Sequence, residues 1–285
     1  MKIATITHGD SSQAIVVVDE SNYVEVSQLF PGTEFPDIKR VIELKTIDEL
    51  KQALANYSGA LKLVGSVKFL APYSHPRLIW GIGLNYVAHA ADLAAVAPGD
   101  EPASFIKGDH TIIGEGENII IPSQSERTTA EAELGIIIGK YCRNVSESEA
   151  LDYLYGVVPV LDQTAEDILL KNPRFLTRSK NFPTFFSFGP SVTTMDEVRS
   201  LYPDFSTINV ATVINGEVHR ENTVSNMTFS PEALISFHSH VMPLYPGDII
   251  STGTPGAVHV NQGDVVECNI PGIGRLVNPV VKEEK

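Results

Sequence analysis

Short apolar runs, separated by glycine, proline and polar residues, dominate most of this chain. Runs of this length and punctuation are typical of β-strands. The dipeptide Asn215-Gly216, between two such runs, predicts a tight hairpin. From residue 78 onward the pattern predicts strands at residues 79–82, 119–121, 134–138, 156–161, 208–214, 248–250, 263–270 and 274–281. It predicts helices only at residues 86–95 and at residues 230–240, where Ser230 caps and Pro231 takes the first helical position.

The first part of the chain has a pattern of its own. A turn at Gly9-Asp10-Ser11 separates two apolar runs, and Thr46 starts an amphipathic segment. The elements expected there are strands at residues 2–7, 13–18 and 24–26 and a helix at residues 46–56. Because residues 67–76 are punctuated by proline, we interpret them as a connector. We therefore predict a small N-terminal β-rich unit over residues 1–70 and a larger, mainly β (α+β) domain over residues 71–285, with a sandwich- or roll-like architecture.

Composition and charge narrow the possible functions. A chain of 285 residues is long enough for one large domain, or for a large domain with a small one. Hydrophobic residues make up 43% and charged residues 20%, which is ordinary for a soluble enzyme. The net charge is -14 and no run of Lys or Arg occurs. The sequence therefore disfavours nucleic acid or an anionic membrane as the main partner.

Cysteine usage and the N-terminal segment indicate the compartment. Cys142 and Cys268 form no C-x-x-C motif, which argues against a disulfide scaffold and against a thiolate zinc site. The N-terminal segment has no signal-type apolar core, and no apolar run approaches transmembrane length. We expect a cytoplasmic protein that does not cross a membrane.

Three carboxylates form the most informative motif. Glu131-Ala132-Glu133 leads directly into an apolar run, and a second apolar run over residues 155–161 ends at Asp162. Side chains two apart on a strand share a face, and burying an acidic pair is costly unless something positive compensates it. An all-oxygen ligand set of this kind suits Mg²⁺ or Mn²⁺ and leaves positions free for substrate. Alone, a Glu-x-Glu pair at a strand start also fits a solvated face.

A second motif lies in the predicted helix at residues 86–95. His89 and Asp92 are three apart and so share one helix face, where the carboxylate can orient the imidazole and raise its basicity. This arrangement is used to activate water. A histidine on a helix can equally be structural. The nearby Gly81-Ile82-Gly83 lacks the third glycine of a dinucleotide-binding loop.

Three further features are weaker when each is taken alone. Lys180 lies in a stretch rich in proline and phenylalanine, which argues against regular helix, and it can stabilise a developing oxyanion or simply be a solvated loop lysine. Residues 251–256 form a turn whose hydroxyl and N–H groups can bind a carboxylate, although ordinary turns look the same. His238 and His240 are a competing metal pair, but residues two apart on a helix do not face each other.

Several segments, taken together and in order, resemble the fumarylacetoacetate hydrolase family over about residues 78–281. The set is far more specific than any single member. The segments are Gly83-Leu-Asn-Tyr-Val-Ala-His-Ala-Ala-Asp92, Glu131-Ala-Glu-Leu-Gly-Ile-Ile-Ile-Gly139, Asp162-Gln-Thr-Ala-Glu-Asp167, Ser179-Lys-Asn-Phe182, Asn215-Gly-Glu217 and Pro246-Gly-Asp-Ile-Ile-Ser-Thr-Gly-Thr-Pro-Gly256.

The resemblance implies a mixed β-sandwich roll, usually a homodimer, which binds Mg²⁺ or Mn²⁺ and can take Ca²⁺ in crystals. It also implies a small-molecule 2-oxo acid as the substrate. The implied residues are Glu131, Glu133 and Asp162 as metal ligands, His89 with its acidic partner Asp92 and Lys180 in catalysis, and Lys107 and Thr252 at the substrate.

This chain departs from the family pattern at three positions. Asp92 is one methylene shorter than the glutamate usual in the family. Glu166 stands where the family commonly has the arginine of Ala-Arg-Asp, which puts a usual ion pair in doubt. Leu169 stands where some decarboxylases have glutamine, which lowers the weight of oxaloacetate decarboxylation.

From the residues and the resemblance we predict divalent-metal-dependent hydrolysis of a C–C bond in a β-diketo acid, such as an acylpyruvate or a fumarylacetoacetate-like substrate. The metal would stabilise a pyruvate-type enolate, His89 would deprotonate water and Lys180 would neutralise developing charge. The alternatives are a 2-hydroxy-hepta-dienedioate isomerase/decarboxylase or a 2-keto-3-deoxy acid dehydratase with the same metal site. A non-catalytic ligand-binding protein of the same fold is a further alternative.

Overall fold

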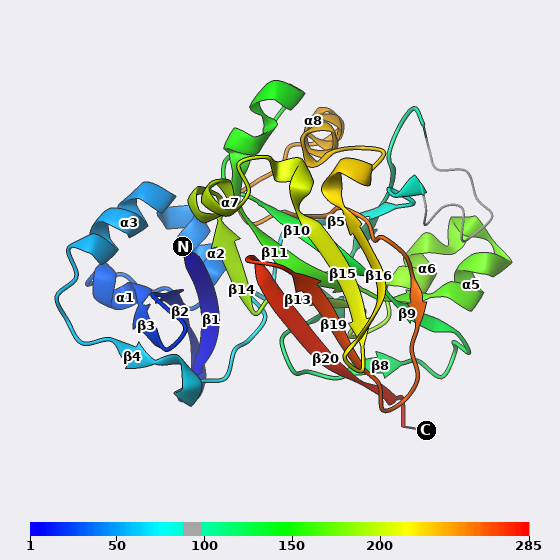
Figure 1. The fold of residues 1–285 in the computed structure, drawn as a ribbon, viewed down its shortest axis with the longest axis horizontal. Helices are drawn as coiled ribbons and strands as arrows, with labels where there is room; N and C mark the ends of the chain where they lie inside the picture. Colours follow the sequence, from blue (N-terminus) through cyan, green and yellow to red (C-terminus); the bar gives the residue numbers. More distant parts are fainter. Residues whose placement is uncertain (88–98, 285) are drawn as a thin grey trace.

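Short strands dominate the computed structural model, which describes residues 1–87 and 99–284 (Figure 1). Within these residues a twelve-stranded sheet forms the largest layer. Its strands run in the order β4 (Lys62–Leu63), β3 (Asn22–Glu25), β2 (Ser11–Val17), β1 (Lys2–His8), β14 (Ser191–Thr194), β11 (Leu154–Asp162), β10 (Ala132–Ile138), β17 (Ile249–Ser251), β5 (Ile79–Gly83) and β6 (Ala103–Lys107). Off this path, β13 (Phe186–Phe188) pairs with β11 and with β7 (Ile112–Ile113).

Two smaller sheets complete the β structure of the described residues. One has the order β16 (Glu217–Thr223), β15 (Asn209–Ile214), β19 (Val265–Ile270), β20 (Gly274–Lys282) and β8 (Ile119–Ile121). The other has the order β12 (Thr164–Ala165), β9 (Thr128–Ala130) and β18 (Val258–His259). The predicted hairpin between β15 and β16 is confirmed, and its turn residues Asn215 and Gly216 have the positive φ values of 53° and 84° that such a turn needs.

The core lies between the large sheet and the five-stranded sheet. Leu134 and Ile136 of β10 share one buried apolar cluster with Val266 of β19 and Leu276 of β20. The opposite face of β10 is also covered, since Ile137 belongs to the cluster that contains the N-terminal strands and helix α2 (Ile38–Leu44). Burial on both faces explains why this strand is a continuous apolar run. The predicted mainly β, sandwich-like fold is confirmed.

The helices of the described residues are α1 (Val26–Leu29), α2, α3 (Ile47–Ala55), α5 (Glu166–Lys171), α6 (Leu176–Lys180), α7 (Met195–Leu201) and α8 (Pro231–Val241). The helices expected at residues 46–56 and 230–240 are confirmed as α3 and α8; Thr46 forms a capping box with Glu49, and Ser230 caps α8. The helix expected at residues 86–95 falls mostly outside the described residues.

The prediction that the stretch around Lys180 cannot be helical is wrong. Residues Leu176–Lys180 form α6. Pro173 starts a 3-10 turn just before the helix, and the next proline, Pro183, comes after it. Because both prolines flank the helix instead of interrupting it, its backbone hydrogen bonds are intact.

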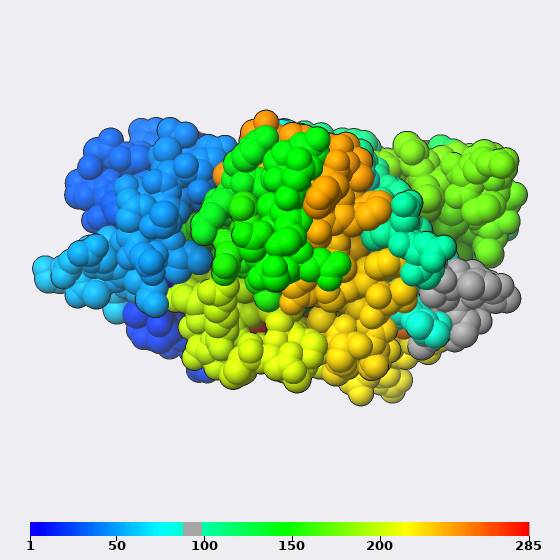
Figure 2. All heavy atoms as spheres, turned by 90° about the horizontal axis from the view of Figure 1, so that it is seen from above, coloured from blue at the N-terminus to red at the C-terminus, as the bar shows by residue number. Residues whose placement is uncertain are grey.

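The N-terminal strands extend the large sheet. β1 pairs antiparallel with β14, and Lys2 lies opposite Thr193. Figures 1 and 2 show this part of the chain at one end of the long axis, with α5 and α6 at the opposite end. The boundary at residue 70 stays a prediction. No helix among the described residues is both long and apolar enough to cross a membrane. Cys142 and Cys268 are buried and unbridged.

Candidate active site

Strand register brings the three predicted carboxylates together. β10 and β11 are antiparallel with Ala132 opposite Leu161, and the Asp162 N–H donates to the Glu131 carbonyl over 2.9 Å. Glu131 therefore lies across from Asp162 and two residues from Glu133, so the three side chains share a face. One oxygen of each carboxylate lies within 4.8 Å of those of the other two.

All three carboxylates are buried, and each has hydrogen-bond donors. Glu133 accepts from the Ser251 hydroxyl at 2.6 Å and from the Gly253 N–H at 2.9 Å. Glu131 accepts from the hydroxyls of Thr164 at 2.7 Å and Thr129 at 3.2 Å. These donors come from β9, β12, β17 and the turn after β17, so four segments orient the carboxylates.

Two lysines supply the positive charge that the buried carboxylates require. Lys180, from the last turn of α6, donates to Glu131 at 2.8 Å and to Asp162 at 3.0 Å, and its ammonium lies 4.9 Å above the Phe105 ring. Lys107, at the end of β6, donates to the other Asp162 oxygen at 2.5 Å. Both ammoniums are buried in contact with carboxylates, so Lys180 is not a solvated loop lysine.

Burial and charge shift the pKa values of these groups in different directions. Burial, reinforced by the neighbouring Asp162 carboxylate, raises the pKa of Glu133 to about 8. Burial alone would lower the pKa of Lys180, but the carboxylates of Asp162 and Glu131 outweigh it and raise that pKa. For Lys107 burial prevails over the Asp162 charge, and the pKa is lowered. Glu133 therefore holds a proton more tightly than an ordinary glutamate does.

The described residues fit a divalent cation. Two ammoniums face the three carboxylates, so the fully ionised set keeps one negative charge that a cation can neutralise. Oxygen-only ligands suit Mg²⁺ or Mn²⁺ rather than metals that prefer thiolate or imidazole. Structure and residue chemistry together support a divalent-metal site at Glu131, Glu133 and Asp162.

A cavity of about 480 Å³ adjoins the carboxylates. Glu131 and Lys180 form part of its wall, as does Thr254 of the turn after β17. Most of the remaining wall is apolar and comes from β5, β6, α5, α6 and the short turn between α5 and α6. A cavity of this size holds a small organic molecule. The site therefore combines a charged end and an apolar chamber.

The structure places the other predicted residues as follows. Thr252 is buried, and its hydroxyl donates to the Leu134 carbonyl at 2.8 Å, whereas Thr254, two residues on, lines the cavity. The substrate role predicted for Thr252 stays a prediction. Reasoning from the sequence missed Thr254, because both threonines lie in a turn and no periodicity there shows which of them lines the cavity. His89 and Asp92 lie outside the described residues.

The competing histidine pair does not join a metal cluster among the described residues. On α8 the His238 Nδ1 lies 2.7 Å from the Leu234 carbonyl, and the His240 Nδ1 lies 2.8 Å from the Ser236 carbonyl. Both rings are thus engaged by the preceding turn of their own helix. This supports a structural role for the two histidines.

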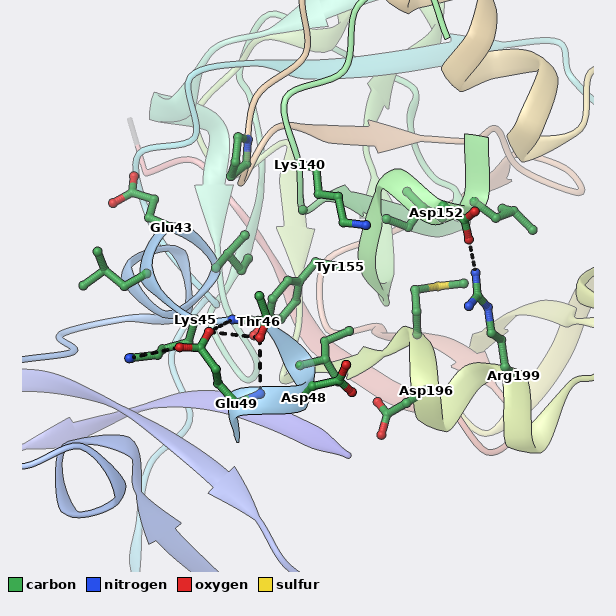
Figure 3. Close-up of a pocket in the computed structure, with 18 residues that line it drawn as sticks. Glu43, Lys45, Thr46, Asp48, Glu49, Lys140, Asp152, Tyr155, Asp196 and Arg199 are labelled. Atoms are coloured by element: carbon green, nitrogen blue, oxygen red, sulfur yellow. Dashed lines mark hydrogen bonds and ion pairs between the residues drawn. The ribbon is translucent and has the colours of Figure 1, made fainter. Parts of the chain in front are cut away.

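A second cavity, of about 540 Å³, is lined by residues of α2, α3, β11 and α7 and of the adjoining loops (Figure 3). Two ion pairs lie among its lining residues: Lys45 with Glu49 at 3.5 Å, and Arg199 with Asp152 at 2.8 Å. Tyr155 also lines it. None of the predicted site residues that the structure describes does so, and we therefore place the chemistry in the 480 Å³ cavity.

Several known proteins are similar to this chain in sequence or in fold. Residues 78–281 match the family model described as fumarylacetoacetate (FAA) hydrolase C-terminal. A 4-hydroxyphenylacetate degradation bifunctional isomerase/decarboxylase of Escherichia coli is 37% identical over 75% of this chain and 48% of its own length. An oxaloacetate tautomerase, fahd2, mitochondrial, of Xenopus laevis is 35% identical over 76% of this chain and 69% of its own.

A solved structure of similar fold contains a metal ion and a 2-oxo acid. The maleylpyruvate hydrolase from Sphingobium sp. SYK-6, in complex with manganese(II) and pyruvate, superposes with a TM-score of 0.81 at 26% identity, and the match covers 100% of both chains. The family model, the relatives and the similar fold agree with the resemblance that the sequence motifs indicate. The chain belongs to the fumarylacetoacetate hydrolase family.

Proposed function

We propose that this protein is a divalent-metal-dependent enzyme that hydrolyses a C–C bond in a β-diketo acid of the acylpyruvate type. The observation that carries the proposal is the buried triad Glu131, Glu133 and Asp162, which opens through Glu131 and Lys180 into a cavity large enough for such an acid. The related hydrolase that contains manganese(II) and pyruvate supports both the metal class and the 2-oxo acid.

Each site residue has a separate role in the proposed reaction. Glu131, Glu133 and Asp162 would hold Mg²⁺ or Mn²⁺, which supplies Lewis acidity toward a 2-oxo acid. Lys180 fixes the orientation of Glu131 and Asp162 and places a positive charge on the cavity wall, where it favours negative charge that develops on the substrate. Lys107 holds the far oxygen of Asp162. From the sequence, His89 oriented by Asp92 takes the proton of the attacking water.

The test is a spectrophotometric assay on acetylpyruvate with Mg²⁺, with Mn²⁺ and after EDTA. We expect metal-dependent loss of the enol absorbance, with pyruvate and acetate as products. Replacing His89 with alanine should lower turnover by a factor of about 10² to 10⁴. His240→Ala is the matched control, because His240 is exposed and bonded within its own helix. Near-normal turnover in His89→Ala would remove His89 from the mechanism.

The alternative reaction class keeps the metal site and omits water. The E. coli relative named as an isomerase/decarboxylase favours it. Turnover in ¹⁸O-labelled water separates the two classes, because only hydrolysis puts labelled oxygen into an acid released from the acyl side. A non-catalytic protein of the same fold would bind metal and 2-oxo acids and turn none of them over.

We also propose that the protein works as a homodimer in the cytoplasm. The family resemblance supports the dimer. The acidic net charge and the lack of a basic run support a small molecule, instead of nucleic acid, as the binding partner. Light scattering coupled to gel filtration would give the mass, and a mass of one chain at micromolar concentration would refute the dimer.

A further inference from the structure

Most of the wall of the 480 Å³ cavity is apolar. Its apolar side chains include those of Ile82, Phe105, Leu169, Leu170 and Leu176. Leu170 is 64% exposed although it is a large apolar side chain, and Leu169 beside it is half-buried. Apolar side chains that line a cavity and remain accessible gain free energy when an apolar ligand covers them.

The charges on this wall do not suit a second anionic group. The charged residues that line the cavity within the described chain are Glu131, Glu166 and Lys180. Lys180 is engaged by Glu131 and Asp162. Glu166 is 5% exposed and pairs with Arg127, which does not line the cavity.

The residue at position 166 places a negative charge on the cavity wall. Glu166, in Ala165-Glu166-Asp167, lines the cavity. Its positive partner, Arg127, comes from the segment before β9 and donates to the Glu166 carboxylate. The Arg127 side chain is 59% exposed, so its charge is largely solvated on the outer side. A ligand carboxylate in the chamber would face Glu166 and lose its water without gaining a cation.

We infer that the site selects a 2-oxo acid whose distal part is uncharged and apolar, such as an alkyl or aryl acyl group, and discriminates against a second carboxylate. The inference rests on the proposed function in one respect: the 2-oxo acid end lies at the triad, so the distal end lies in the apolar chamber. Glu166 and Leu170 are then specificity-determining residues.

The expected difference in binding affinity follows from the free energy of transferring apolar groups from water into the cavity. Each methylene buried in the chamber should improve binding by about fourfold. Exchanging a terminal methyl group for a carboxylate loses that gain and adds the desolvation of an unpaired charge near Glu166, so we expect binding to weaken by about tenfold or more.

The test measures binding, so it does not depend on turnover. The Mn²⁺-loaded full chain is titrated calorimetrically with 2-oxohexanoate and with 2-oxoadipate, which differ only in a terminal methyl group against a carboxylate. We expect 2-oxohexanoate to bind at least about tenfold more tightly. Equal or tighter binding of 2-oxoadipate, or no binding of 2-oxohexanoate, overturns the inference. Failure of acetylpyruvate hydrolysis alone would overturn only the proposed reaction.

Two variants locate the selectivity. Exchanging the pair as Arg127→Glu with Glu166→Arg keeps an ion pair and reverses the sign on the wall, and Arg127→Lys is its control. Leu170→Arg adds a cation at a position that is 64% exposed, and Leu170→Met is its control. Each test variant should raise the affinity for 2-oxoadipate relative to 2-oxohexanoate by about tenfold, and the controls should keep the original preference. Unchanged ratios in both test variants would remove these residues from substrate selection.

Discussion

Replacing Lys180 with methionine should destabilise the metal-free protein strongly and the metal-loaded protein much less. Lys180 donates charge-assisted hydrogen bonds to Glu131 and Asp162, at 2.8 and 3.0 Å, in a site where all three side chains are buried. Methionine keeps the length and the apolar stem of the side chain and removes only the charge and the donors. A divalent ion held by the same carboxylates would supply the missing positive charge.

The loss of folding free energy in Lys180→Met can be estimated in two ways. Breaking a buried ion pair by removing one partner costs about 3–5 kcal/mol. Alternatively, one carboxylate that loses its cation takes up a proton, and neutralising a group of ordinary pKa near 4 at pH 7 costs about 4 kcal/mol. The two figures agree. At about 2–4 °C for each kcal/mol in a domain of this size class, the melting temperature in EDTA should fall by about 6–20 °C.

Thermal melts of wild type and Lys180→Met, in EDTA and in saturating Mn²⁺, provide the assay. Lys51→Met is the control, because Lys51 is 51% exposed and pairs with Asp196 at 3.4 Å; a surface pair of this kind should change the melting temperature by no more than about 4 °C. A fall in EDTA no larger than the control's would refute the structural role of Lys180. An equal fall with and without Mn²⁺ would refute its coupling to the metal.

Three further predictions concern the same site. Glu131→Gln should lower the bound metal to well below one ion per chain by elemental analysis, while Glu43→Gln, on the exposed surface, should leave it unchanged. Because the metal-free Glu133 holds its proton up to a pKa of about 8 and a ligand must be ionised, Mn²⁺ affinity should rise by up to about tenfold per pH unit between pH 6 and 8 and level off above; a pH-independent affinity would contradict this. Gly81→Ala should lower stability by about 1–3 kcal/mol, since a Cβ there would lie 2.3 Å from the Phe105 ring, whereas at Gly83 the nearest atom lies at 3.6 Å and the same change should have little effect.

The sequence could predict those features that arise within one or two strands. Glu131 and Glu133 share a face by strand period alone, and the apolar runs that follow Glu133 and precede Asp162 marked β10 and β11 correctly. That these strands are neighbours, with Glu131 across from Asp162, is a property of the sheet order that no local pattern in the sequence shows. The proline-rich pattern does not indicate the helix Leu176–Lys180, because a proline interrupts a helix only when it lies inside it. Here Pro173 and Pro183 lie on either side of the helix.

The partners of the carboxylates could not be read from the chain. Lys107 and Asp162 are 55 residues apart, and β6 reaches β11 only across β5, β17 and β10 of the large sheet. Arg127 and Glu166 meet because β9 pairs with β12, which leads into α5. Neither pair has a local periodicity that would identify it. Sequence reasoning alone also left Thr252 and Thr254 undistinguished, since only packing shows which hydroxyl faces the Leu134 carbonyl and which faces the cavity.

The uneven distribution of partners over the three carboxylates indicates how the site controls its charge. Glu131 and Asp162 each face at least one ammonium, whereas Glu133 is held by a hydroxyl and a backbone N–H, which are neutral donors. The excess negative charge therefore falls on Glu133, whose pKa is raised to about 8 by burial and by the nearby Asp162. A proton can neutralise that excess in the absence of metal, and a divalent cation would have to replace this proton in order to bind Glu133. Because the two lysines already hold Glu131 and Asp162 in place, Glu133 is the ligand through which pH would control metal binding.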